Sequence, residues 1–387
     1  MAHILIAYKQ FPAPSVGHAG GESLFRLMAA LHARGHRLTL VARIADDEQH
    51  HLPDVAAICD RIDTVRHHRS RSGPRLAAFL RSYWELRGAI RRVLREVQPD
   101  LMHVETTQTA LAALGLERPP ASYRTQDVNW FLLDQRLARA VGPRRLVTLV
   151  QRAFFHRLEP WLCRHYDLML AISEGDMRLL RPRCDPARLL MVPLTPAVAA
   201  DADAAPAVGG ASNLLFVGAM GRDHNQEGIL WFLDHAWGLV LTRCPEARLL
   251  IVGGDPPEAL KARADGERVV VTGFVPDLAP WYRSAAVFIS PLLVAGGLLQ
   301  KVVDAMAMGV PVVATSVSNH GVGAMPGVQL LTADGPTSFA EGVVRLLQDP
   351  LGRAEMGVAA RAFVAEHYDP AAAVDRWEKA LLALLAV

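Results

Sequence analysis

Short apolar runs alternate with longer amphipathic stretches along almost the whole chain. Apolar runs bounded by turn residues are typical of strands buried on both faces of a parallel sheet, and the amphipathic stretches between them are typical of covering helices. In the first half we expect strands at residues 3–9, 36–43, 61–66, 100–105, 121–126, 167–173 and 188–193. In the second half we expect strands at residues 213–220, 247–254, 269–274, 286–292, 310–316 and 328–334. The pattern predicts an α/β protein with two Rossmann-like sheets in tandem.

The two series of strands are separated by residues 196–212, which are small, contain proline and glycine, and show no periodicity. This composition is typical of a linker. We therefore expect an N-terminal domain at residues 1–195 and a C-terminal domain at residues 213–367. Two further amphipathic stretches end the chain without another strand, and we expect the last one, residues 368–387, to return to the N-terminal domain.

The length and composition set limits on the class of protein. With 387 residues, of which 51% are hydrophobic, the chain is long enough for two separate hydrophobic cores. The spacing of the cysteines suggests neither a zinc site nor a disulfide framework; they are Cys59, Cys163, Cys184 and Cys244. The sequence starts without the basic segment and apolar core of a signal peptide, and it has no apolar run of about 18 residues. We expect a soluble protein of the reducing cytoplasm.

The net charge of +2 hides an asymmetry between the two parts of the chain. Residues 1–200 contain 28 Lys and Arg against 19 Asp and Glu, which is +9, and the remaining residues contain 13 against 20, which is −7. A basic half can attract an anionic surface at the inner face of the membrane or an acidic acceptor, and a solvated arginine-rich face is the alternative. No recognition motif accompanies the charge, so we expect no nucleic-acid partner.

The sharpest candidate site follows the strand predicted at residues 286–292. Ligands of open parallel sheets collect at the carboxyl ends of strands, where loops and helix N-termini converge. Gly296, Gly297 and Leu298 can bring backbone amides close to phosphate oxygens at a helix start. Lys301 adds a full positive charge in the first turn of that helix, although a lysine there opposes the helix dipole. A residue that breaks a local rule beside a pair of glycines indicates a function.

Two further features extend this candidate site. Asp304 follows Lys301 by one helical turn and can accept hydrogen bonds from two ribose hydroxyls, or it can pair with Lys301 on the surface. After the first strand of the second domain, Gly218 permits close approach of the backbone and Arg222 can reach a diphosphate. Arg222 can equally form a turn pair with Asp223.

Two other segments are read from their local patterns. Gly20 and Gly21 lie immediately before a predicted helix, where backbone amides can approach an anionic or oxygen-rich ligand or form a flexible turn. His224 and Asn225 are candidate cap residues for a helix that begins near Gln226.

Other chemistries find no support in the sequence. Two histidine pairs lie in charged segments without carboxylates at ligand spacing, so we expect no metal site; they are His50 with His51 and His67 with His68. The residues around Ser173 and Ser290 do not form the GxSxG motif of a hydrolase nucleophile.

The quoted residues resemble the retaining glycosyltransferases with two Rossmann-like domains (the GT-B type), in the family-4-like class called glycosyl transferases group 1. The most specific stretch is residues 291–315, PLLVAGGLLQKVVDAMAMGVPVVAT, which is similar to the family's donor motif PLxxGxGxxxKxLEAMAxGxPVVAT. Other matching pieces are residues 216–220 with 231–233, residues 250–254, residues 271–275, and Gly20 with Gly21. The resemblance therefore extends over nearly the whole chain.

The resemblance implies a donor site between the two domains for a UDP-, GDP- or dTDP-sugar. Lys301 and Arg222 would lie near the phosphates, Asp304 at the ribose, and the backbone around Phe274 and Val275 at the base. Gly20 and Gly21 would close over the diphosphate or the donor sugar from the opposite domain.

The resemblance also implies how such an enzyme works. No metal and no protein nucleophile would be needed, because the departing diphosphate takes the proton of an acceptor hydroxyl that attacks from the same face. Electrostatic stabilisation of the leaving group would be the main contribution of the protein. The acceptor, whether a glycan, a lipid-linked molecule or a small molecule, is not indicated by these residues.

Three departures from the family pattern leave alternatives open. Gly296 stands where many relatives have a glutamate, and Asp304 replaces a longer glutamate. Gln126 stands where relatives tend to have a histidine that contacts the donor sugar, and an amide can hydrogen-bond to a sugar but cannot shuttle a proton near neutrality. A binding or partner subunit with a degenerate site is one alternative, and a sugar-nucleotide 2-epimerase of the same fold is another.

Overall fold

The computed structural model describes residues 1–16, 18–67, 75–197 and 212–386. The chain divides into two compact units: unit 1 is Met1–Leu194 with Ala371–Val387, and unit 2 is Thr195–Pro370. Almost all of the linker expected at residues 196–212 lies outside the described residues.

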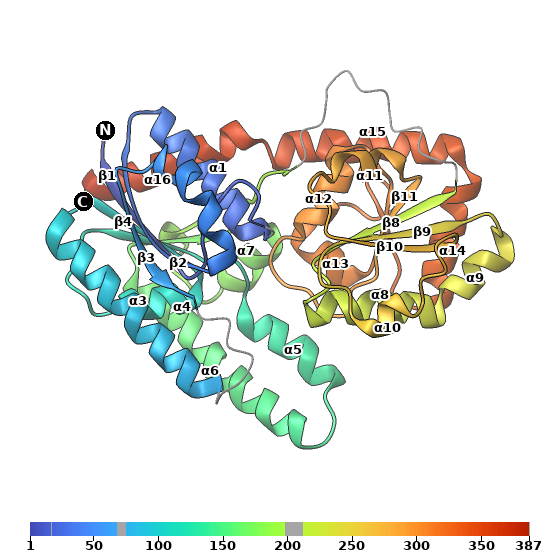
Figure 1. Cartoon of the computed structure of the whole chain (residues 1–387), viewed down its shortest axis with the longest axis horizontal. Coiled ribbons are helices and arrows are strands. Elements are labelled where there is room, and N and C mark those ends of the chain that lie inside the picture. Colours follow the sequence, from blue (N-terminus) through green and yellow to red (C-terminus); the bar gives the residue numbers. More distant parts are fainter. Residues whose placement is uncertain (17, 68–74, 198–211, 387) are drawn as a thin grey trace. The chain divides into compact units, whose positions relative to one another are not determined.

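Unit 1 is built on a seven-stranded parallel sheet with the order β3-β2-β1-β4-β5-β6-β7 (Figure 1). Its strands are β1 His3–Tyr8, β2 Arg37–Ile44, β3 Arg61–Arg66, β4 Leu101–Glu105, β5 Ala121–Arg124, β6 Leu168–Ala171 and β7 Leu189–Met191. Its helices are α1 Ala19–Ala33, α2 Leu52–Ala56, α3 Arg75–Val97, α4 Thr106–Ala113, α5 Asn129–Arg139, α6 Pro143–His165, α7 Glu174–Leu180 and α16 Pro370–Ala383. Helices therefore follow most strands, as parallel connections require.

Strand β1 contributes side chains to two hydrophobic cores of unit 1. Leu5 and Ala7 of β1 pack into the core that includes α3, α4 and α6, whereas Ile4, Ile6 and Tyr8 pack into the core that includes α1 and α16. Successive side chains of a strand point to opposite faces, so one apolar run serves both layers. This explains why the run has no alternating polar positions.

The last helix, α16, packs on unit 1, as the sequence predicts. Trp377 is fully buried and its ring lies 4.9 Å from that of His103. Glu378 accepts hydrogen bonds from Arg34, over 2.5 Å, and from His36, over 2.8 Å. These contacts tie the C-terminal segment to α1 and to the start of β2.

Unit 2 has a six-stranded parallel sheet with the order β10-β9-β8-β11-β12-β13 (Figure 1). Its strands are β8 Asn213–Val217, β9 Arg248–Val252, β10 Val269–Gly273, β11 Val287–Ser290, β12 Val312–Ala314 and β13 Leu331–Thr332. Its helices are α8 Asp223–His235, α9 Trp237–Arg243, α10 Glu258–Lys261, α11 Ala279–Ser284, α12 Gln300–Ala307, α13 Ser316–Val322, α14 Pro336–Gln348 and α15 Pro350–His367. Each strand that the sequence predicts in the two halves is present, which confirms the α/β class.

Two helix starts differ from the prediction. α1 begins at Ala19, so Gly20 and Gly21 lie in its first turn and not before it, because the side chain of His18 accepts a hydrogen bond from Gly21 N and caps the helix. α8 begins at Asp223 with Arg222 as its N-cap, so His224 and Asn225 are inside the helix and do not cap it.

The cysteines also differ from the prediction. Cys163 and Cys184 form a disulfide, with Cα atoms 5.8 Å apart, although the sequence indicated no disulfide. The two residues come from α6 and from the turn after α7, and they are 21 positions apart, so only the tertiary fold brings them together. Over the described part of the chain, no helix combines the length and the apolar character needed to cross a membrane.

Candidate functional site

Lys301 lies in the first turn of α12, as predicted, and its ammonium group is held from two sides. Its Nζ donates a hydrogen bond to Asn225 Oδ1 over 2.6 Å and lies 4.5 Å from the centre of the Phe216 ring. Burial and, to a smaller extent, the positive charge of Arg222 together lower the pKa of Lys301 to about 7. An amine that loses part of its charge through burial regains it when an anion arrives, so this geometry is suited to a phosphate group.

Asn225 was predicted as a cap residue, but in the structure it lies inside the first turn of α8 and its side chain contacts Lys301. It is 4% exposed, its Nδ2 donates to Ala219 O over 2.9 Å, and its Oδ1 accepts from Lys301. It therefore connects the loop after β8 to the lysine of α12. A polar residue near a helix start gave no signal of this role, because its partner is 76 positions away.

Gly218 is required by this arrangement. A Cβ atom there would lie 2.8 Å from Asn225 Nδ2 and 3.1 Å from Lys301 Nζ. Any larger residue would push on the pair that holds the lysine. The sequence predicted that a glycine here lets the backbone come close to another group. In the structure that group is the hydrogen-bonded pair of Lys301 and Asn225.

The glycine loop before α12 is tightly packed. Gly297 has φ of 58° in the left-handed region, and Leu298 is 6% exposed. A Cβ atom on Gly321 would collide with the Gly297 carbonyl oxygen, so α13 and this loop approach each other closely. Gly296 is half-buried. The loop is thus a closely packed turn whose backbone is positioned by its contact with α13.

Asp304 lies one turn after Lys301 and is 3% exposed. Its Oδ1 accepts hydrogen bonds from Ala197 N over 2.7 Å and from Gln300 Nε2 over 3.0 Å. Gln300 Nε2 also donates to Thr195 O over 2.8 Å, so the chain entering unit 2 is fixed to α12. In this structure the carboxylate of Asp304 therefore anchors the segment that enters unit 2, and its predicted role at the ribose stays a prediction.

The two residues predicted at the base lie directly after β10. Gly273 ends that strand with φ of 76°, a value that suits glycine, and the chain turns there. Phe274 is 70% exposed, and Val275 is half-buried. An exposed aromatic ring at the carboxyl end of a parallel strand is available to stack on a planar ligand.

Within unit 1, Gln126 is part of a polar network at the carboxyl ends of β1, β4 and β5. The Tyr8 hydroxyl donates to Gln126 Oε1 over 3.4 Å, and Gln126 Nε2 donates to Glu105 Oε2 over 3.3 Å. A Cβ atom on Gly20 would lie 2.5 Å from Gln126 Nε2, so the first turn of α1 packs directly on this amide. The structure thus brings Gly20 and Gln126 together.

Glu105 and Arg124, the centre of this network, are fully buried and were read only as strand residues in the sequence. Arg124 Nε donates to Glu105 Oε1 over 2.6 Å, and His103 Nε2 lies 3.0 Å from the same oxygen. Burial by itself raises the pKa of Glu105, but the charges and hydrogen bonds of Arg124 and His103 outweigh it, so the pKa is lowered. The sequence did contain a signal for this pair, because Glu105 and Arg124 are charged residues inside strands that were predicted to be buried.

Two other buried carboxyls lie in unit 1. Burial raises the pKa of Glu159 to about 7 against the hydrogen bonds of Asn129, whose Nδ2 lies 2.7 Å from Glu159 Oε1. Burial likewise raises the pKa of Asp176 to about 7, although Ser173 donates to it over 2.8 Å. In both groups burial disfavours the charged form, so their hydrogen bonds only partly offset the cost of ionisation.

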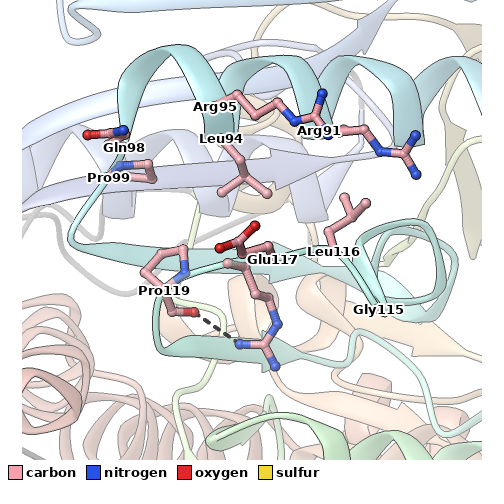
Figure 2. A pocket seen from close by; sticks show the side chains of 10 residues that line it. Arg91, Leu94, Arg95, Gln98, Pro99, Gly115, Leu116, Glu117 and Pro119 are labelled. Atoms are coloured by element: carbon pink, nitrogen blue, oxygen red, sulfur yellow. Dashed lines mark hydrogen bonds between the residues drawn. The ribbon is translucent and has the colours of Figure 1, made fainter.

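A cavity of about 770 Å³ lies elsewhere in unit 1, at the amino ends of β4 and β5 (Figure 2). Figure 2 shows that its walls come from the end of α3 and from the loop after α4. The residues that line it are Arg91, Leu94, Arg95, Gln98, Pro99, Gly115, Leu116, Glu117, Arg118 and Pro119. None of them belongs to the predicted site, and ligands of such sheets bind at the opposite, carboxyl edge.

Two family profiles match the chain one after the other. That of the glycosyl transferase 4-like domain matches residues 20–195, and that of the glycosyl transferases group 1 matches residues 211–349. A curated relative, the 44.6 kDa protein of the cps region of Klebsiella pneumoniae, is 30% identical over 165 residues. That alignment covers 41% of this chain and 42% of the relative, so the chain matches less than half of that protein's length.

Solved structures of similar fold cover the whole chain. Sucrose-phosphate synthase of Thermosynechococcus elongatus has a TM-score of 0.76 and 18% identity, with 99% of each chain covered. HepE of Anabaena, crystallised with UDP-glucose, has a TM-score of 0.70 and 15% identity, with 99% of this chain and 100% of HepE covered. S. aureus TarM, in a complex that contains UDP, has a TM-score of 0.70 and 8% identity, with both chains fully covered at 100%. At these identities the likeness shows the two-domain GT-B fold.

Proposed function

This chain belongs to the group 1 glycosyltransferases, and on that premise we propose that it transfers a sugar from a nucleoside-diphosphate sugar to an acceptor hydroxyl. The donor diphosphate binds at Lys301, with Arg222 as the second cation. UDP is the first candidate among UDP, GDP and dTDP, because HepE and TarM were crystallised with UDP or a UDP-sugar.

The observation that supports this proposal best is the way in which Lys301 is held. Its Nζ is fixed by Asn225 Oδ1 at 2.6 Å, beneath Gly218 and at the start of α12. A positioned, poorly solvated cation interacts more strongly with a phosphate than a solvated one does, and most strongly when charge develops on the leaving diphosphate. The arrangement therefore favours both donor binding and bond cleavage.

Three finer parts of the proposal concern mechanism. We propose retention at the anomeric carbon, with the diphosphate oxygen accepting the proton of the attacking hydroxyl. Lys301 and Arg222 neutralise the leaving group, so we propose that the reaction needs no metal. In unit 1, the amide of Gln126 hydrogen-bonds to the donor sugar, a role that an amide can fill without proton transfer.

The direct test is nucleoside-diphosphate release from a panel of UDP-, GDP- and dTDP-sugars, with and without EDTA. Slow hydrolysis is expected even without an acceptor. We expect one nucleotide to raise the melting temperature of the protein and its sugars to release the diphosphate, unaffected by EDTA. Once an acceptor is found, NMR of the product gives the anomeric configuration. Release that strictly requires a divalent ion would contradict metal independence.

A second candidate, a binding subunit without turnover, is favoured by one observation. Gln126 is already engaged with Tyr8 and Glu105, and the backbone at Gly20 packs closely against its amide. Nucleotide binding without diphosphate release across the whole panel would favour this candidate. Interconversion of the nucleotide sugar without release would instead indicate an epimerase.

A further inference from the structure

Helix α6 of unit 1 has an apolar face that nothing in the described residues covers. The exposed fraction is 67% for Leu146, 57% for Val147, 64% for Val150, 56% for Phe154 and 39% for Trp161. At about 100° per residue these positions share one side of the helix. Large apolar side chains gathered in this way on one surface indicate an interaction site.

The opposite side of α6 is the one that packs within unit 1. Arg152 forms an ion pair with Asp134 of α5, and the ring of His156 lies 4.7 Å from that of Trp130. Further along, Glu159 holds Asn129 at the start of α5. α5 and α6 run antiparallel, and the loop that joins them lies away from the sheet of unit 1 (Figure 1). The apolar face therefore points away from α5.

The same segment is strongly basic. Residues 135–158 contain six arginines and no aspartate or glutamate. Arg144, Arg145 and Arg157 are exposed, and among the described residues no ion pair involves them. Val141, in the loop before α6, adds an apolar side chain that is 81% exposed. Apolar and cationic side chains thus alternate around the free end of the hairpin.

From this combination we infer that the outer face of α6, with Val141, docks on the surface of an anionic lipid bilayer. An interfacial helix places its apolar side chains below the headgroups, while arginines at its margins reach the lipid phosphates. The long arginine stems lie along apolar surface and keep their charge in the phosphate layer. Part of the basic charge of the N-terminal half thereby lies beside an apolar face.

A second copy of this chain is a poorer occupant of the same face. In a twofold dimer the same patch meets itself, so the unpaired arginines of both copies would face each other. Like charges at close range oppose such a contact. The inference does not rest on the donor site in unit 2, so each proposal can fail without the other.

The test is co-sedimentation of the full chain with vesicles of phosphatidylcholine alone or with about one third phosphatidylglycerol. We expect binding to the anionic vesicles in low salt and much weaker binding in high salt, because salt screens the arginines. In the double variant V150D/F154D we expect the partition coefficient to fall at least about tenfold, since two apolar side chains are lost from the bilayer.

Matched variants separate this effect from general damage. L351D/V358D changes two apolar residues of α15 in unit 2 that are 78% and 59% exposed, and it should bind vesicles like the unchanged protein. R144Q/R145Q should lower binding to anionic vesicles, whereas R268Q/R345Q in unit 2 should not. The melting temperature and the nucleotide-induced shift should stay the same in all four variants.

Two results would overturn the inference. One is the absence of vesicle binding in low salt, or vesicle binding of V150D/F154D that equals that of the α15 control L351D/V358D. The other is a dimer of the unchanged protein in sedimentation equilibrium that V150D/F154D converts to monomer without loss of vesicle binding. Binding that falls with the α6 variants alone supports the docking surface.

Discussion

Lys301 Nζ donates to Asn225 Oδ1 over 2.6 Å, and this bond connects the first turn of α12 to the first turn of α8 in unit 2. It holds an ammonium group in a place where burial lowers its pKa to about 7. The lysine is therefore positioned before a ligand arrives, and the ligand supplies the missing negative charge. The pH dependence of donor binding follows from this state.

The affinity for a nucleotide sugar should fall as the pH rises above about 7. The phosphates of such a diester stay ionised near neutrality and raise the pKa of Lys301 in the complex, so binding takes up a proton above the pKa of the free protein. The loss should approach about tenfold per pH unit and should be absent below pH 7. Calorimetric titrations across this pH range measure the affinity, and repeating them in buffers with different ionisation enthalpies measures the number of protons taken up on binding.

The variant Lys301→Arg is the control, because arginine stays protonated at all these pH values. Its affinity should not change with pH through this group. A pH-independent affinity in the unchanged protein would mean that the lysine is already fully charged without ligand.

Gly20 and Gln126 should show strong energetic coupling. A Cβ atom at Gly20 would lie 2.5 Å from Gln126 Nε2, so Gly20→Ala should lower the free energy of unfolding by about 1–3 kcal/mol through overpacking. Gln126→Ala removes the amide with which the new methyl group would collide. The double variant of Gly20→Ala and Gln126→Ala should therefore regain most of the lost free energy of unfolding. Urea unfolding of the four proteins gives the coupling energy. Additive effects would show that α1 moves away from Gln126 at no cost.

The buried pair of Glu105 and Arg124 should be costly to break from one side. Arg124→Met leaves a buried carboxylate without its cation, so we expect a loss of about 3–5 kcal/mol in the free energy of unfolding. The lowered pKa of Glu105 stabilises the fold above the pKa of the unfolded state, and this contribution is lost as the pH falls through the folded value.

Arg61→Met is the matched control, since Arg61 pairs with Glu96 at the surface of unit 1. Exposed pairs contribute little, so its unfolding midpoint should hardly change. Equal losses in the two variants would show that the Glu105 pair is no more important than a surface pair.

Glu159→Gln should stabilise the protein in alkaline but not in acidic solution. Burial raises the folded pKa of Glu159 to about 7, so the unfolded chain releases its proton first and stability falls as the pH rises toward 7. Above that pH the gain from a neutral glutamine should reach at most about 3 kcal/mol. Unfolding at about pH 5 and about pH 8 measures it, with the exposed Glu174→Gln as control. A gain of equal size at both values would contradict a raised pKa.

Much of this fold follows from local patterns in the sequence. Strands such as β1 and β8 are continuous apolar runs because both of their faces are buried, and such runs are visible without a structure. The glycines and the lysine of residues 296–301 lie together in the chain, so their pattern indicated a phosphate site. The residues that were missed depend on distant partners. Asn225 shows its role only beside Lys301.

The same limit applies to unit 1. Glu105 and Arg124 become a pair because β4 and β5 are neighbours in the sheet, which no local pattern indicates. Cys163 and Cys184 meet only when α6 and α7 are packed. The start of α1 was placed too late because the cap is a histidine, His18, which is not among the usual cap residues.

The measurement that tests the central claim most directly is calorimetric titration of UDP, GDP and dTDP into the unchanged protein and Lys301→Ala. For the nucleotide that binds, the variant should lose about 1.5–3 kcal/mol of binding free energy, the range of a hydrogen bond to a charged group. Lys261→Ala, which removes an exposed lysine of the same unit, should bind it unchanged. Equal dissociation constants for the unchanged protein and Lys301→Ala would show that the diphosphate does not bind at Lys301.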